Sequence, residues 1–179
     1  EEAWMILRRA AMLRPNTDPR PFWADLIPHQ QKLIEDPAKR KSGKCSRRSG
    51  KSHGCAAYAI DVCLRKRDAQ VLYIALTRQS AKRIMWGKLL WFDRKYDLRI
   101  TFQHTELIAT LSTGSQITVT GAADQSEIEK FRGSAYDLVI IDECQAFGPY
   151  LEELIGDVIE PALIDHDGAL VLIGPPNAA

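Results

Sequence analysis

Three unbroken apolar runs, separated by stretches with helical periodicity, constrain the fold of this 179-residue chain more than any other feature. They occupy residues 71–76, 138–141 and 169–173. Strands that are apolar on both faces are typical of a parallel sheet covered by helices on both sides. An alternating pattern over 107–111 and 116–120, interrupted by Ser112-Thr113-Gly114-Ser115, adds a β-hairpin. The sequence therefore predicts an α/β fold with a mainly parallel sheet.

Helices are expected between these runs, over 1–14, 25–36, 51–67, 77–92 (with Thr77 as the N-cap) and 149–159. Residues 15–22 contain three prolines and predict a linker. We expect an N-terminal helix and linker over 1–21 and an α/β domain over 22–179. No apolar run approaches the roughly 18 residues of a membrane span. Because the chain opens on Glu1-Glu2 without an initiator Met or a leader, we expect a fragment or processed product without a signal peptide.

Charge is divided unevenly along the chain. Residues 1–100 carry 22 lysines and arginines against 10 acidic residues, whereas residues 101–179 carry 2 against 13. Such asymmetry favours a polyanionic partner for one face, although folding can mix the two halves. The four cysteines, at 45, 55, 63 and 144, show no C-x-x-C pair and no zinc spacing, which predicts reduced and mostly buried thiols.

A phosphate-loop motif directly precedes the helix expected over 51–67. It reads Cys45-Ser46-Arg47-Arg48-Ser49-Gly50-Lys51-Ser52 and departs from G-x-x-x-x-G-K-[ST] only at Cys45. A glycine at 50 lets the backbone approach phosphates at a positively polarised helix N-terminus. Lys51 can reach the β and γ phosphates, and the Ser52 hydroxyl can bind magnesium. Taken alone, the same residues also fit a basic loop that caps a helix.

The segment before this loop is unexpectedly polar. A buried strand should lie there, but the sequence reads Lys39-Arg40-Lys41-Ser42-Gly43-Lys44. Lysines in a central strand would carry a heavy desolvation cost. We therefore expect the strand to be very short or distorted.

An acidic pair, Asp142-Glu143, follows the apolar run 138–141. Doubly wound sheets bind ligands at the carboxyl ends of their strands. There Asp142 can hold magnesium and Glu143 can orient and deprotonate an attacking water. Alone the pair also fits a surface turn, but together with the phosphate loop it predicts hydrolysis of a nucleoside triphosphate.

Four further polar residues have functional interpretations. Asn177, in the turn after the run 169–173, can bind a phosphate or water, and the Gln30 amide matches the N6/N7 edge of adenine. Arg47 or Arg48 in the loop, and Arg132 before the acidic strand, can reach the γ-phosphate. A plain turn for Asn177, a surface amide for Gln30 and a solvated loop arginine for Arg132 remain alternatives.

Four segments in this order resemble the ATPase domain of the large terminase subunit of tailed bacteriophages, the DNA-packaging motor. They read PHQQKLIEDPAKRKSGKCSRRSGKS, VLYIALTRQSAKRIMW, FRGSAYDLVIIDECQAF and LVLIGPPNA, within residues 22–178. The resemblance implies a P-loop NTPase of the additional-strand, catalytic-glutamate type, with a mainly parallel sheet and helices on both faces. Ser46 replaces the usual glycine of the loop, and Pro175 replaces the usual threonine of the coupling motif.

The resemblance also assigns roles to single residues. It implies adenine recognition by Gln30, a cis-acting arginine at Arg47 (with Arg48 next) and an arginine donated to a neighbouring subunit at Arg132. It implies Asp142 as the magnesium ligand and Glu143 as the catalytic carboxylate, with Asn177 retained in the coupling motif. ATP and Mg²⁺ are the implied cofactors.

As a terminase subunit, the chain would drive double-stranded DNA into a procapsid, as part of a ring that is expected to be pentameric. The implied partners are the portal protein and the small terminase subunit, in the cytoplasm of the infected host and outside the virion, with no membrane. A nuclease domain and the last ATPase strands are expected to be absent, so the chain should not nick DNA.

Two other functions stay open from the sequence. A DEAD-like helicase shares the Asp-Glu strand end, although Cys144 and Gln145 follow it here instead of x-Asp or x-His. A nucleotide-dependent DNA-binding module that does not hydrolyse ATP is the other.

Overall fold

The computed structural model describes residues 20–44 and 49–174, and its centre is a seven-stranded sheet. The strand order is β1-β7-β6-β2-β5-β4-β3. The first five of these strands run parallel: β1 (Arg40–Lys44), β7 (Ala169–Gly174), β6 (Leu138–Asp142), β2 (Gln70–Ala75) and β5 (Gln116–Gly121). The mainly parallel sheet predicted from the apolar runs is confirmed.

The last two strands, β4 (Ile108–Thr110) and β3 (Thr101–Gln103), are antiparallel. β4 and β5 form the predicted hairpin, and Gly114 takes a positive φ of 84° in its turn. β3 was not predicted, because three residues are too few to show a period.

Helices flank the sheet where the sequence predicts them. After the 3₁₀ turn η1 (Trp23–Asp25), α2 (Pro28–Glu35) begins at a proline, which suits a first helical position. The other elements are α3 (Lys51–Arg65), α4 (Arg78–Ala81), η2 (Lys82–Trp86), α5 (Gly87–Tyr96), α6 (Gln125–Glu129), η3 (Cys144–Phe147), α7 (Tyr150–Glu153), η4 (Leu154–Ile159) and α8 (Glu160–Ile164). The expected cap is present, since Thr77 Oγ1 accepts a hydrogen bond from Ser80 N. The expected helix 1–14 and most of its linker lie outside the described residues.

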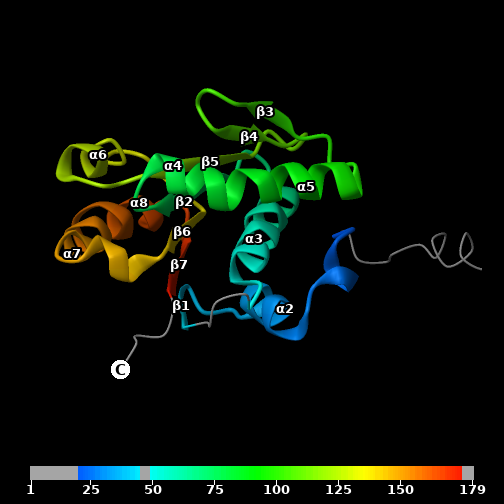
Figure 1. The fold of residues 1–179 in the computed structure, drawn as a ribbon, viewed down its shortest axis with the longest axis horizontal. Coiled ribbons are helices and arrows are strands. Elements are labelled where there is room, and N and C mark those ends of the chain that lie inside the picture. Colours follow the sequence, from blue (N-terminus) through cyan, green and yellow to red (C-terminus); the bar gives the residue numbers. More distant parts are fainter. Residues whose placement is uncertain (1–19, 45–48, 175–179) are drawn as a thin grey trace, which may run out of the picture.

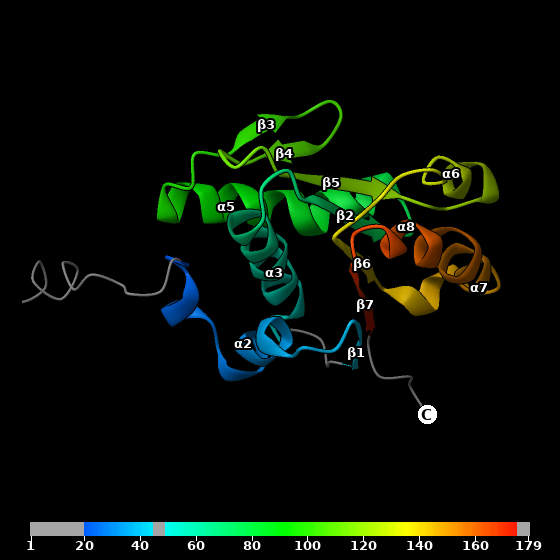
Figure 2. The same cartoon turned by 180° about the vertical axis from the view of Figure 1, so that it is seen from behind.

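Two apolar cores, one on each face of the sheet, hold these layers together. Along β2, Tyr73 belongs to the core under α3 and α5, whereas its neighbours Leu72 and Ile74 belong to the core under α6, η4 and α8. Figures 1 and 2 show α3 and α5 on one side of the strands and α7 and α8 on the other. This alternation explains why the strands are apolar on both faces. None of the helices in the described segments is long and apolar enough to cross a membrane.

The polar segment before the phosphate loop forms a regular edge strand, so the expected distortion is not found. β1 pairs with β7 on one side, and its residues alternate between exposed and half-buried. Lys41 bends toward α2, and its ammonium donates to Leu33 O at 2.8 Å and to the Tyr58 hydroxyl at 3.1 Å. Burial lowers the pKa of Lys41. The lysines thus stay at the margin of the core.

Two of the cysteines are buried, as predicted. Cys55 and Cys63 lie inside α3 in the first core, Cys144 is half-buried, and all three are free thiols. Burial raises the pKa of Cys63. Cys45 lies outside the described residues.

Candidate functional site

The carboxyl ends of β1, β7 and β6 bring the two motifs to one edge of the sheet. Through the pairing of β1 with β7 and of β7 with β6, Gly43, Ile173 and Asp142 stand level with one another. At a strand spacing of about 4.8 Å, Asp142 lies about 10 Å from Gly43, two strands away. β7 separates the strand before the phosphate loop from the strand that ends in the acidic pair. The chain leaves this edge after Lys44 and returns to begin α3 at Lys51.

Several predicted site residues fall outside the described segments. Cys45, Ser46, Arg47 and Arg48 belong to the loop between β1 and α3, and Asn177 follows β7. Their predicted roles stay predictions.

α2 holds the last two residues of the phosphate loop. Gln30 is buried; its amide nitrogen donates to Gly50 O at 2.9 Å, and its amide oxygen accepts from Ile27 N at 3.1 Å. A ring nitrogen of His29 lies 2.9 Å from Ser49 O. Gly50 has a positive φ of 77°, and a Cβ there would lie 2.7 Å from the Gln30 amide nitrogen. Gln30 therefore fixes the loop, and the one N–H and one lone pair that remain on its amide leave adenine recognition as a prediction.

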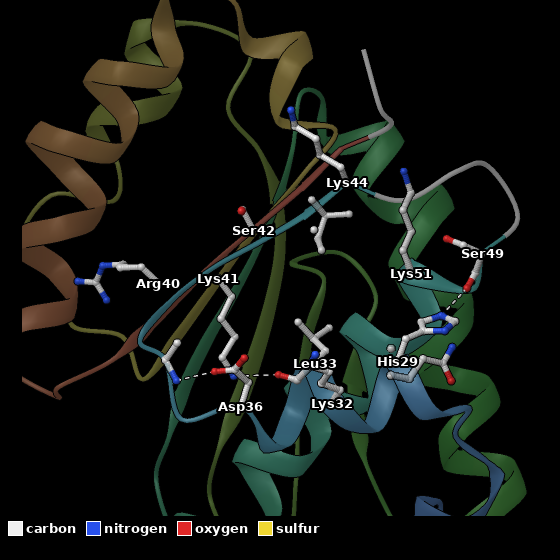
Figure 3. Close-up of a pocket in the computed structure, with 15 residues that line it drawn as sticks. His29, Lys32, Leu33, Asp36, Arg40, Lys41, Ser42, Lys44, Ser49 and Lys51 are labelled. Carbon is white, nitrogen blue, oxygen red and sulfur yellow. Dashed lines mark hydrogen bonds between the residues drawn. The ribbon is translucent and has the colours of Figure 1, made fainter. Parts of the chain in front are cut away.

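A pocket of about 580 Å³ opens between α2, β1 and the start of α3. Figure 3 shows Lys44 and Lys51 extending in the same direction beside it, whereas Lys41 turns toward α2. Within the described residues, neither Lys44 nor Lys51 has an acidic partner, and the buried Ser49 hydroxyl has no hydrogen-bond partner. Unpaired cations, an orphaned hydroxyl and a helix N-terminus together suit the phosphates of a nucleotide.

The acidic pair has a constrained geometry at the end of β6. Asp142 is buried, and its carboxylate accepts from the Tyr73 hydroxyl at 2.7 Å and from Glu143 N at 2.8 Å. Glu143 is half-buried and left-handed, with φ at 53°. A non-glycine residue in this region is strained, and such strain concentrates at functional sites. The turn directs the Glu143 side chain out of the strand register.

A magnesium site at this edge would not be a protein-only cluster. No group of three or more His, Cys, Asp or Glu side chains is placed to hold a metal in the described part of the chain. Ser52 lies half-buried in the first turn of α3, and Asp142 offers a buried carboxylate without a cationic partner among these residues. A hydroxyl and one carboxylate fit a magnesium ion that takes its other ligands from phosphates and water.

Arg132 is not brought to this edge. It lies after α6, where its guanidinium contacts Glu129 Oε2 at 2.5 Å and Asp157 O at 3.1 Å. It lines a separate cavity of about 240 Å³ beside η4 and α8. The carboxylate of Glu129 raises the pKa of Arg132, which stays charged. A role for Arg132 in the γ-phosphate chemistry of its own chain is not supported by this position.

Sequence reasoning missed three residues of the site. Lys44 was interpreted only as part of an awkward strand, although its position directly before the phosphate loop was a usable signal. Gly54 leaves room for Gln30, since a Cβ at 54 would lie 3.1 Å from Gln30 Cγ. Tyr73 was hidden within an apolar run.

The sheet order, the helix that starts at Lys51 and the acidic strand end define an α/β domain with a phosphate-binding edge. A family model described as terminase large subunit, T4likevirus-type, N-terminal, matches residues 44–175. The chain belongs to this terminase family, and the resemblance seen in its motifs is confirmed. The match does not favour a helicase or a non-hydrolysing module. A search of curated proteins finds no match.

Solved structures show the same fold. The ATPase domain of the large terminase of Thermus phage P74-26 is similar with a TM-score of 0.70 and 23% identity, over 93% of this chain and 72% of that one. The large terminase of a thermophilic bacteriophage follows at 0.68 and 16%, over 82% and 38%. That of bacteriophage HK97 follows at 0.65 and 16%, over 86% and 34%. The chain thus spans little more than a third of the last two proteins.

Proposed function

We propose that this domain hydrolyses ATP with Mg²⁺ and powers a viral DNA-packaging motor. The observation that carries the proposal is the meeting of α3, with Lys51 and Ser52 in its first turn, and the Asp142-Glu143 pair at one edge of the sheet. Structures of the large terminase from the thermophilic bacteriophage, in complex with ADP and with ATP-γ-S, support nucleotide binding by this fold. The position of β7 between β1 and β6 supports a P-loop ATPase with an additional strand and a catalytic glutamate.

Each residue has a role that follows from its place. Lys51 and the amides of the α3 N-terminus bind the phosphates, where they stabilise the negative charge that develops during transfer. Ser52 and Asp142 would hold magnesium, which neutralises charge on the β and γ phosphates when bound. Glu143 orients the attacking water and accepts its proton. Arg47, or Arg48, would reach the γ-phosphate from the loop.

Hydrolysis in the motor would move double-stranded DNA into a procapsid. The portal protein and the small terminase subunit are the proposed partners, and a ring of identical subunits, taken as a pentamer, is the proposed working form. Because Arg132 lies away from the edge of its own chain, we place its action in the site of a neighbouring subunit.

Glu143→Gln tests the chemistry directly. The amide cannot accept the water proton, so turnover should fall by roughly 10²–10⁴-fold while ATP binding persists. Phosphate release and nucleotide affinity measure the two effects, with Glu152→Gln on α7 as an exposed control that should leave both unchanged. Unchanged turnover in Glu143→Gln would remove the glutamate from its role.

A mixture of two inactive variants extends this experiment to Arg132. Arg132→Ala keeps Glu143, and Glu143→Gln keeps Arg132, so neighbouring subunits could complete one working site. Each variant alone should be nearly inactive, and a mixture should regain activity. If the mixture stays inactive while wild type hydrolyses ATP, Arg132 does not act between subunits.

A further inference from the structure

A tyrosine on the central strand of the sheet bonds directly to the acidic pair. Tyr73 lies in β2 with no exposed surface, and its hydroxyl donates to Asp142 Oδ2 at 2.7 Å. Asp142 itself is 1% exposed, so water competes little for this hydrogen bond. The pair joins β2 to the end of β6 beneath the phosphate-binding edge.

The sheet geometry explains why this contact forms. Tyr73 is level with Ile140 on the neighbouring strand, and both belong to the core on the α3 face. Because side chains alternate along a strand, Asp142 also points to this face, two residues and roughly 6.6 Å further on. The long phenol spans that offset, and its hydroxyl reaches the carboxylate from the side of the core.

The two oxygens of Asp142 are therefore held by different donors. Tyr73 holds Oδ2, and Glu143 N holds Oδ1, so the carboxylate plane is fixed in the absence of any cation. Each carboxylate oxygen keeps a further lone pair for another partner. Residues that orient a metal ligand in this way commonly affect metal affinity by roughly 10–100-fold.

A purely packing role for Tyr73 is the competing interpretation. A buried tyrosine needs a partner for its hydroxyl, and Asp142 could simply be that partner. The two interpretations differ for phenylalanine, which fills the same volume. A packing residue would lose only some stability, whereas a residue that orients Asp142 would change how the chain responds to magnesium.

We propose that Tyr73 is a positioning residue that orients the Asp142 carboxylate for magnesium. The proposal rests on the proposed function, since it requires Asp142 to bind the metal that accompanies ATP. It adds a residue from a strand outside both nucleotide motifs. Through β2, the helices α4 and α5 that follow it become mechanically connected to the metal ligand.

Tyr73→Phe tests the role through its magnesium dependence. We expect the Mg²⁺ concentration for half-maximal ATP binding to rise about tenfold, with ATP affinity in EDTA unchanged. Tyr136→Phe, at the opposite end of β6, removes a phenol hydroxyl outside the site and should leave the Mg²⁺ requirement unchanged. In an Asp142→Asn background, Tyr73→Phe should add nothing to the magnesium effect, because the two residues then no longer act on a charged ligand.

The outcomes separate the two proposals. If wild type binds ATP in a Mg²⁺-dependent way and Tyr73→Phe shows the same Mg²⁺ requirement with only a lower melting temperature, Tyr73 is a packing residue and the positioning role is wrong. An equal magnesium effect of Tyr73→Phe with and without Asp142 would also overturn it. If wild type shows no Mg²⁺-dependent ATP binding, the proposed function itself fails, and this role with it.

Discussion

Strand β6 has a buried aspartate at each end, and the two are treated in opposite ways. Asp137, just before the strand, is contacted by the Lys66 ammonium, by Gln70 N at 2.7 Å and by His166 at 3.1 Å. Asp142, at the end of the strand, has only the Tyr73 hydroxyl and a backbone amide as donors in the described structure.

The difference lies in who provides the positive charge. At Asp137 a lysine of the same chain provides it, and the carboxylate joins β2, the end of α3 and the turn before β7. Charge left uncompensated in a buried site is costly, so the neutral surroundings of Asp142 favour a cation from outside the protein. A structural and a ligand-binding carboxylate can thus be told apart by their donors, although the exposure of both is low.

The largest expected effect separates the two aspartates by activity. Asp142→Asn should lower ATP hydrolysis by at least about 100-fold, because a metal contributes several kcal/mol of charge stabilisation. Its unfolding free energy should change by less than about 1 kcal/mol, since both present donors are neutral. Steady-state phosphate release and urea unfolding measure the two quantities. A strong loss of stability in this variant would break the comparison.

A smaller effect is expected from the other end of the strand. Asp137→Asn should destabilise the domain by about 2 kcal/mol, because it removes charge-assisted hydrogen bonds but leaves a lysine that can still reach water. Nucleotide affinity, measured on the folded protein, should stay within twofold of wild type. Asp167→Asn, at an exposed ion pair with Lys39, is the matched control and should have no measurable effect. If Asp137→Asn weakens nucleotide binding strongly, the division of roles is wrong.

The smallest effect is a pH dependence. Burial raises the pKa of Asp137, but hydrogen bonds from Lys66, Gln70 N and His166 outweigh it and hold the pKa below its usual value. A lowered pKa stabilises the folded state above the unfolded pKa of about 3.9, and this contribution disappears as pH falls through the folded value.

The stability difference between wild type and Asp137→Asn should therefore be constant from about pH 5 to 7 and shrink below that range. Urea midpoints at several pH values measure it. A difference that grows on acidification would mean that Asp137 is not stabilised as a carboxylate.

Sequence patterns predicted the parallel sheet, the helix after the phosphate loop and the acidic strand end. Each of these depends on local periodicity or on a motif with fixed spacing. Gln30 shows what such patterns cannot give, because its bond to Gly50 joins residues that lie 20 positions apart. Tyr73 was counted as apolar, and its hydroxyl mattered only once β2 lay beside β6. The place of β1 at the sheet edge was equally invisible, since strand order depends on the whole fold.

The close fit of Gln30 between Gly50 and Gly54 limits how this sequence can diverge. A side chain at position 54 would meet the carbon chain of residue 30, and one at position 50 would meet its amide while adopting a backbone conformation that favours glycine. Exchanges at these three sites are therefore tolerated only in concert. A chain that enlarges residue 54 must shorten residue 30, and it then has to find another anchor for the turn that precedes α3.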